Sequence, residues 1–145
     1  MKQLAKIEKI KIIGCECEAY ITIIINGIKL ECYLPMTKEE IMKIFQENTT
    51  TLVDLWLENE HYTNKESYEK ILEPGEHLEK YLTGKSGNVF GKVTEILGED
   101  ELRLKNMHMF IDVKGISTER IHPGEWLKVP GEWRLYPPEG EFAKD

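Results

Sequence analysis

The chain has 145 residues, of which 41% are hydrophobic and 31% are charged, and its formal net charge at pH 7 is −7. This composition excludes a disordered chain, which would carry too few apolar residues to form a core. The longest aliphatic run, Ile23-Ile24-Ile25, is far shorter than the ~18 apolar residues that a membrane-spanning helix needs. We therefore expect a soluble, cytoplasmic protein with one domain of ordinary size or two very small ones.

The acidic residues are concentrated in the middle of the chain. From Glu39 to Glu79 there are 11 acidic residues and three lysines, a net charge of −8, so the remainder is close to neutral. Acidic proteins are poor nonspecific binders of nucleic acid. The excess of 22 Glu and 16 Lys over 2 Gln is found in thermophilic proteins, and AT-rich coding also enriches Lys.

Residues 4–13 alternate in a way that predicts a strand, which leads through Gly14 into a β-hairpin. The alternating run from Cys15 to Leu34 is interrupted by Asn26-Gly27, which favours a type I′ turn because both central residues need positive φ. The resulting register places Tyr20 opposite Tyr33 on the outer face. This pair is a candidate partner-binding patch, or it serves to stabilise the sheet.

The three cysteines fall on the apolar face of the predicted hairpin. Cys15-x-Cys17 with Cys32 could hold a metal, but no Cys-x-x-Cys or His-rich segment completes a zinc set. The register separates Cys32 from Cys17 by more than about 10 Å, too far for a disulfide. We expect small buried thiols in a reducing compartment, with no metal and no cofactor.

Three further segments precede the second half. Thr37 and Glu40 form a predicted capping box that starts a helix over 38–46. Residues 52–61 favour a strand, although a helix fits the spacing of Leu52, Leu55 and Trp56. A second capping box predicts a short helix or turn over 63–72, and the small, polar residues 83–88 predict a loop between two halves.

The second half consists of short alternating segments typical of strands. They cover residues 89–97, 102–105, 107–114, 126–129 and 133–136, with a turn at 98–101. The whole pattern predicts an α+β, mostly β protein with an antiparallel sheet or small barrel and one to three short helices.

Four segments between residues 89 and 136 carry a resemblance to a known fold. They are Phe90-Gly91-Lys92-Val93, Phe110-Ile111-Asp112-Val113, the turn and strand Pro123–Val129, and Gly131–Tyr136. Their order is similar to that of the OB-fold, a five-stranded Greek-key barrel, over about a third of the chain. The resemblance implies an oligonucleotide or oligosaccharide site across the second and third strands. With the hairpin and the predicted loop, it gives the expected organisation: a hairpin-based half with short helices at 1–85, an OB-like half at 86–137 and a flexible tail at 138–145.

Single-stranded nucleic acid binding needs aromatic stacking platforms and cations along one groove. The candidate ligand-binding residues are Arg103, Lys105, Phe110, Lys114, Trp126, Lys128, Arg134 and Tyr136. Between residues 88 and 137, however, eight acidic residues are interleaved with seven basic ones. Nucleic acid is therefore the less favoured partner.

No segment carries a recognised catalytic motif. Gly84-Lys85-Ser86 lacks the earlier glycine of a phosphate-binding loop, and the four histidines are scattered. We therefore expect a non-enzymatic binding or assembly module for a protein partner, or for self-association, away from membranes. The alternatives are a single-stranded nucleic-acid-binding protein and an enzyme whose site has no recognisable motif.

Overall fold

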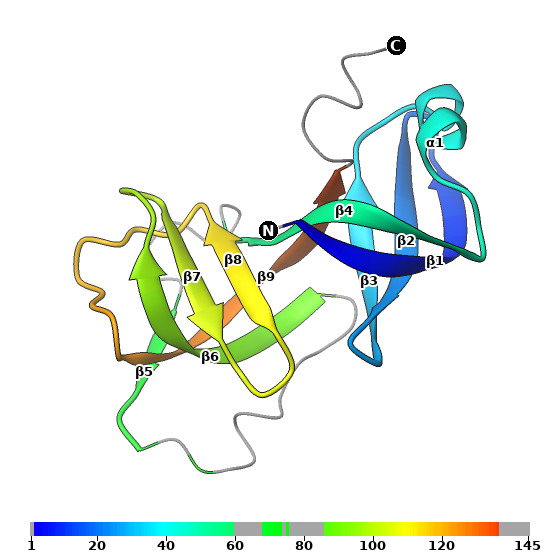
Figure 1. The fold of residues 1–145 in the computed structure, drawn as a ribbon. Coiled ribbons are helices and arrows are strands. Elements are labelled where there is room, and N and C mark those ends of the chain that lie inside the picture. Colours follow the sequence, from blue (N-terminus) through cyan, green and yellow to red (C-terminus); the bar gives the residue numbers. More distant parts are fainter. Residues whose placement is uncertain (1, 60–67, 74, 76–85, 137–145) are drawn as a thin grey trace. The chain divides into compact units, whose positions relative to one another are not determined.

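The computed structural model describes residues 2–59, 68–73, 75 and 86–136, and for 86 and 87 it describes the backbone alone. Within these ranges the protein is α+β and mostly β, with one short helix (Figure 1). The elements are β1 (Lys2–Ile13), β2 (Glu18–Ile25), β3 (Ile28–Leu34), α1 (Lys38–Ile44), β4 (Thr49–Glu58), β5 (Glu69–Ile71), β6 (Ser86–Ile96), β7 (Glu101–Lys105), β8 (Phe110–Lys114) and β9 (Trp126–Tyr136). The described part of the chain contains no helix that could span a membrane.

The strands form a closed sheet in the order β3-β2-β1-β4-β8-β7-β6-β9-β5, in which β9 also pairs with β3 and with β4. The pairings β3–β9 and β4–β8 are parallel. The chain divides into two compact units: unit 1 contains Met1–Leu55 and Trp133–Asp145, and unit 2 contains Trp56–Glu132. Both β4 and β9 contribute residues to each unit. The halves 1–85 and 86–137 stay a prediction, and the tail 138–145 lies outside the described residues.

Unit 1 is built on the predicted hairpin. Tyr20 pairs with Tyr33 across β2 and β3, as the Asn-Gly turn requires, and Asn26 and Gly27 have φ of 51° and 77°. Apolar side chains at alternate positions of the two strands are fully buried. Trp133, the first residue of β9 that belongs to unit 1, is 1% exposed and adds the largest buried side chain to this core. The capping box of α1 is also confirmed.

The prediction that all three cysteines are buried is wrong for two of them. Cys15 and Cys17 are exposed, and Cys32 alone is buried. The cause lies in the connection between β1 and β2, where Gly14 and Glu16 have φ of 63° and 65°. Residues 14–17 therefore form a turn, and β2 starts only at Glu18.

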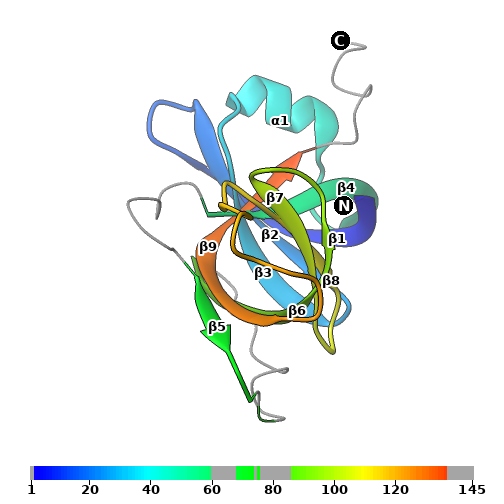
Figure 2. The ribbon, with the colours of Figure 1, turned by 90° about the vertical axis from the view of Figure 1, so that its left-hand side faces the viewer.

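Unit 2 contains an antiparallel meander of β6, β7 and β8, and β9 pairs with the other edge of β6. Figure 2 shows how strongly β9, in orange, bends along its length. Leu102 and Leu104 alternate with outward-facing polar residues along β7, so they reach the core while their neighbours face outward. The short β5 pairs with β9.

The segment 107–114 was predicted as one strand, but β8 starts at Phe110. The side chain of the buried Asn106 sets this boundary, because its Oδ1 accepts hydrogen bonds from the backbone N–H groups of His108 and Met109. Its Nδ2 donates to the carbonyl of Phe90 at 3.0 Å. The polar side chain thus replaces strand pairing with a tight turn.

Three other predicted segments correspond to parts of strands β4, β5 and β9. Residues 52–61 contribute to β4, so the strand interpretation is confirmed for the described part. The predicted helix or turn over 63–72 falls partly outside the described residues, and Glu69–Ile71 forms β5. The segments 126–129 and 133–136 form one strand, β9, which runs through Pro130 and Gly131. A Cβ on Gly131 would lie 2.8 Å from the carbonyl oxygen of Glu58, so this close approach requires glycine.

Candidate functional site

The structure separates the residues that sequence analysis grouped into one ligand site. Arg103, Lys105, Phe110, Lys114, Trp126 and Lys128 belong to unit 2, whereas Arg134 and Tyr136 belong to unit 1, as do Tyr20 and Tyr33.

Four outward-facing side chains form a continuous row across unit 2. Trp126 of β9 pairs with Lys92 of β6, Lys92 pairs with Lys105 of β7, and Lys105 pairs with Phe110 of β8. We call these four residues the outer row of unit 2. Phe110 is 40% exposed, and the ammonium of Lys105 lies 5.3 Å from its ring centroid. Two cations thus lie side by side between two aromatic rings.

An open groove of about 360 Å³ runs along this row. It is lined by Lys92, Thr94, Lys105, Asn106, Met107 and Trp126. None of the described residues that line it carries a carboxylate, and Met107 is 57% exposed. In the part of the chain that the structure describes, neither lysine forms an ion pair.

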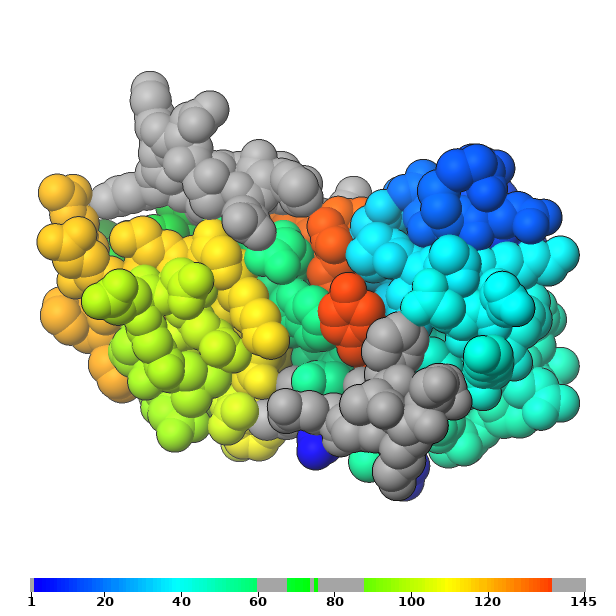
Figure 3. Space-filling model, turned by 90° about the horizontal axis from the view of Figure 1, so that it is seen from above, coloured from blue at the N-terminus to red at the C-terminus, as the bar shows by residue number. Residues whose placement is uncertain are grey.

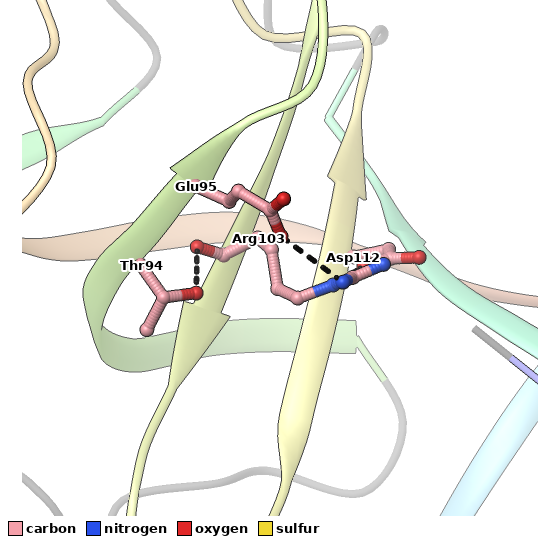
Figure 4. A network of polar contacts seen from close by, with 4 residues as sticks. All are labelled: Thr94, Glu95, Arg103 and Asp112. Atoms are coloured by element: carbon pink, nitrogen blue, oxygen red, sulfur yellow. Dashed lines mark hydrogen bonds and ion pairs between the residues drawn. The ribbon is translucent and has the colours of Figure 1, made fainter.

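The neighbouring row of unit 2 is different, because its charges are compensated. Figure 4 shows Arg103 between two carboxylates: its Nε donates to Asp112 at 2.7 Å, and its Nη1 lies 3.2 Å from Glu95. Thr94 donates to the backbone carbonyl of Arg103 at 3.3 Å. Arg103 is therefore engaged within the sheet.

The ionisation of this ion pair follows its geometry. The hydrogen bond with Asp112 raises the pKa of Arg103, although burial opposes this. For Asp112 burial is the largest single effect and favours the neutral form, but the hydrogen bond from Arg103 and the nearby positive charges together outweigh it, so the pKa of Asp112 is lowered. Both groups are charged near neutral pH.

The two remaining lysines of the predicted set also have contacts within unit 2. The ammonium of Lys114 lies 4.4 Å from the ring centroid of Trp56. The ammonium of Lys128 lies 5.7 Å from that of Phe90, and Lys128 is paired with Glu69 in the β5–β9 register. Both distances fit cation–π contacts. Neither lysine is among the described residues that line the groove.

Unit 1 has an outer row of its own, made by Lys11, Tyr20, Tyr33 and Arg134, which are paired in that order across β1, β2, β3 and β9. The rings of Tyr20 and Tyr33 are 5.6 Å apart and inclined at 60°. The Arg134 guanidinium lies 4.7 Å from the Tyr33 ring, and the Tyr33 hydroxyl donates to Glu18. The two central rings thus have partners within unit 1.

Sequence analysis missed four groove residues: Lys92, Thr94, Asn106 and Met107. The alternation of Phe90 and Lys92 along β6 placed both on one face, but the β6–β7 register shifts by one residue between Val93 and Glu95. This bulge decides that Lys92 faces Lys105. Met107 fell inside the predicted strand 107–114, whereas β8 starts three residues later at Phe110.

The described residues contain no group of three or more His, Cys, Asp or Glu side chains arranged to hold a metal ion. The groove is the candidate site because lysine and aromatic side chains meet in its lining. No protein-family model and no curated protein matches this sequence.

Proposed function

We propose that the protein is a binding module that takes single-stranded nucleic acid in the groove along the outer row of unit 2. The observation that carries this proposal is the direct cross-strand pairing of Lys92 with Lys105. Like charges directly opposite each other destabilise a sheet. An anion bound between them relieves that repulsion, so the arrangement suits a phosphate-bearing ligand.

The two ends of the row support a polymer of bases rather than a simple anion. Trp126 and Phe110 present partly exposed rings on either side of the lysines. Bases stack on such rings with a contribution of about 1–3 kcal/mol each, whatever their sequence. Met107 and Thr94 add apolar and hydroxyl surface to the lining. Rings outside and cations inside match a ligand with alternating bases and phosphates.

The strand order supports an OB-like barrel in each unit. In the OB-fold the first three strands form a meander, the fourth pairs with the first, and the fifth runs parallel to the third. Unit 1 has this arrangement, with β1–β2–β3 as the meander, α1 before β4, and the end of β9 parallel to β3.

Unit 2 has the same neighbours in permuted chain order. Its meander is β6–β7–β8, β9 pairs with β6, and the strand parallel to β8 is the end of β4, which comes first in the chain. The oligonucleotide-binding face of such barrels is on the second and third strands. In unit 2 these are β7 and β8, which carry Lys105 and Phe110.

The proposal is tested with a fluorescently labelled oligothymidine and the full chain at low ionic strength. We expect saturable binding by fluorescence anisotropy, with roughly a tenfold or larger loss of affinity in Lys92→Glu/Lys105→Glu. The matched control is Lys11→Glu/Lys43→Glu, which makes the same change in net charge on unit 1. No binding by the wild type, or an equal loss in both variants, would contradict the proposal.

A second measurement separates contact with phosphates from a general charge effect. Each lysine that neutralises a phosphate of a single strand contributes about 0.7 to the slope of log K against log salt. Lys92→Ala/Lys105→Ala should therefore reduce the slope by about 1.4. An unchanged slope would mean that these lysines do not contact the strand.

The second candidate function is a module that binds a protein partner, self-association included. It is favoured by Leu4 and Leu52, which are paired across β1 and β4 and are 66% and 41% exposed. Sedimentation velocity over a range of concentrations tests the self-association form of this candidate. We expect a concentration-dependent increase in mass that Leu4→Lys removes, and a constant monomer mass would contradict it.

A further inference from the structure

The turn between β1 and β2 brings two thiols together at the surface of unit 1. The Sγ atoms of Cys15 and Cys17 are 2.7 Å apart, and both residues are exposed. Positive φ at a residue other than glycine is uncommon, yet Glu16 between them has φ of 65°. The unusual backbone at Glu16 is part of the turn that leaves the two thiols facing each other.

The turn is tied to the beginning of α1. The carbonyl oxygen of Glu16 accepts a hydrogen bond from the backbone N–H of Lys38 at 2.9 Å, and the two side chains lie 3.9 Å apart as an ion pair. Figure 3 shows the blue segment that contains the turn at the surface, beside the cyan segment that contains α1. The thiols are therefore held near each other by contacts that involve neither sulfur atom.

We propose that Cys15 and Cys17 form a redox-active dithiol that closes to an intramolecular disulfide by exchange with a low-molecular-weight disulfide. One cysteine thiolate attacks the small disulfide RSSR, forms a mixed disulfide and releases RS⁻. The second cysteine thiolate then attacks the sulfur of the first and releases the other RS⁻. The two cysteines lose two protons and two electrons, and RSSR is reduced to two RSH.

The contact between the thiols is symmetric, because either sulfur can be the donor of the hydrogen bond. That hydrogen bond is the largest of the effects that raise the pKa of Cys17. The thiolate is the attacking species in exchange, so either cysteine can attack the small disulfide, and the other then closes the bond.

Cys32 provides an internal contrast. It is fully buried in the core of unit 1, and burial raises the pKa of its thiol. Buried thiols with raised pKa values are inert towards exchange. The reactive chemistry is thus confined to the turn, independently of the groove on unit 2.

The test uses the reduced full chain, treated with oxidised glutathione under native conditions and then alkylated, with peptide mass spectrometry as the readout. We expect Cys15 and Cys17 to lose two hydrogen atoms together and to gain no glutathione, while Cys32 stays a thiol. Cys32→Ala should behave like the wild type. A persistent glutathione adduct, a disulfide between chains, or thiols that remain unreacted would overturn the proposal.

Two single variants test the two steps of the exchange. Both substitutions are at exposed positions, so neither removes core packing. Cys17→Ser should stop at a mixed disulfide on Cys15, and Cys15→Ser should stop at a mixed disulfide on Cys17, because in each variant the second attack is lost. A variant that gains no glutathione would mean that its remaining thiol does not exchange, which would overturn the proposal.

Discussion

The outer rows of the two units contain the same kinds of side chain in opposite order. In unit 1 the cations Lys11 and Arg134 lie at the ends, and two tyrosines lie between them. In unit 2 the rings of Trp126 and Phe110 lie at the ends, and two lysines lie between them. Each row crosses four strands of its own unit.

The order of the side chains decides whether the central residues of a row find interaction partners within their own unit. The central tyrosines of unit 1 contact each other, and Tyr33 also has Glu18 and Arg134 as partners. The central lysines of unit 2 repel each other, and neither has an ion-pair partner in the described residues. A sequence that keeps a locally unfavourable pairing is typical of a functional position. In the proposed function, the outer row of unit 1 therefore stabilises its sheet, whereas the outer row of unit 2 binds the ligand.

The largest effect, on both stability and oligothymidine binding, is expected from Gly91→Ala, beneath the outer row of unit 2. A Cβ at this position would lie 2.9 Å from Cβ of Leu104 and 3.2 Å from the carbonyl oxygen of Lys105. The substitution should cost about 1–3 kcal/mol of stability by overpacking. It should also displace Lys105 from its position opposite Lys92.

Urea unfolding and oligothymidine binding measure both consequences of Gly91→Ala. The matched control is Gly98→Ala, whose added Cβ meets nothing within 4 Å and should change stability by less than about 0.5 kcal/mol. Equal stability of the two variants would contradict the packing argument.

A comparable effect, confined to binding, is expected from Trp126→Ala. The loss of one stacking platform costs about 1–3 kcal/mol, or roughly 5- to 150-fold in affinity. Tyr136→Ala, on the other half of β9, is the control and should leave the affinity within about twofold. If fluorescence anisotropy shows the larger loss for Tyr136→Ala, the ligand contacts unit 1 instead.

A smaller change in stability is expected from Asp112→Asn, which breaks the ion pair next to the groove. Hydrogen bonds to charged groups contribute about 1.5–3 kcal/mol, and the 26% exposure of the Arg103 side chain places this one near the lower end, at about 1.5 kcal/mol. Chemical denaturation measures the loss. Binding of oligothymidine should be retained, and a loss as large as that of Lys92→Glu/Lys105→Glu would remove the distinction between the two rows.

Unit 1 should respond to Tyr33→Phe with a loss of about 1 kcal/mol, the usual contribution of one hydrogen bond. A double-mutant cycle with Glu18→Ala isolates the bond between the tyrosine hydroxyl and the carboxylate. Affinity for oligothymidine should stay unchanged. Additive effects of the two substitutions would mean that this hydrogen bond does not stabilise unit 1.

The smallest effect is the pH dependence of the stability that the Arg103–Asp112 pair contributes. The pKa of Asp112 is lower in the folded protein than in the unfolded chain, so the pair stabilises the fold above about pH 4 and loses this effect as the pH falls below it. The stability difference between wild type and Asp112→Asn should be constant from about pH 7 to 5 and shrink below about pH 4. A difference that grows on acidification contradicts the sign.

The hairpin of unit 1 and the capping box of α1 were predictable because each depends on a local rule. Asn26-Gly27 specifies the turn and Thr37 with Glu40 specifies the cap, and the structure agrees with both. The turn at residues 14–17 was not predictable, because its positive φ at Glu16 has no marker in that residue type. This turn exposes Cys15 and Cys17, which the predicted strand had placed in the core.

The candidate site was predictable in its residue types but not in its arrangement. Lys105, Phe110 and Trp126 were selected as cations and rings on alternating strands, and all three belong to the outer row. Lys92 was missed because a β-bulge changes the register between β6 and β7. Arg134 was included because nothing in the sequence indicates that β9 passes from unit 2 into unit 1.

Backbone-amide NMR of the full chain, titrated with a short oligothymidine, tests the contrast between the two rows most directly. Binding along the outer row of unit 2 predicts chemical-shift changes at Lys92, Lys105, Phe110 and Trp126, including the indole N–H. The amides of Lys11, Tyr20 and Tyr33 should stay unchanged in the same titration. Changes centred on unit 1, or no saturable change in either row, would contradict the assignment of ligand binding to unit 2.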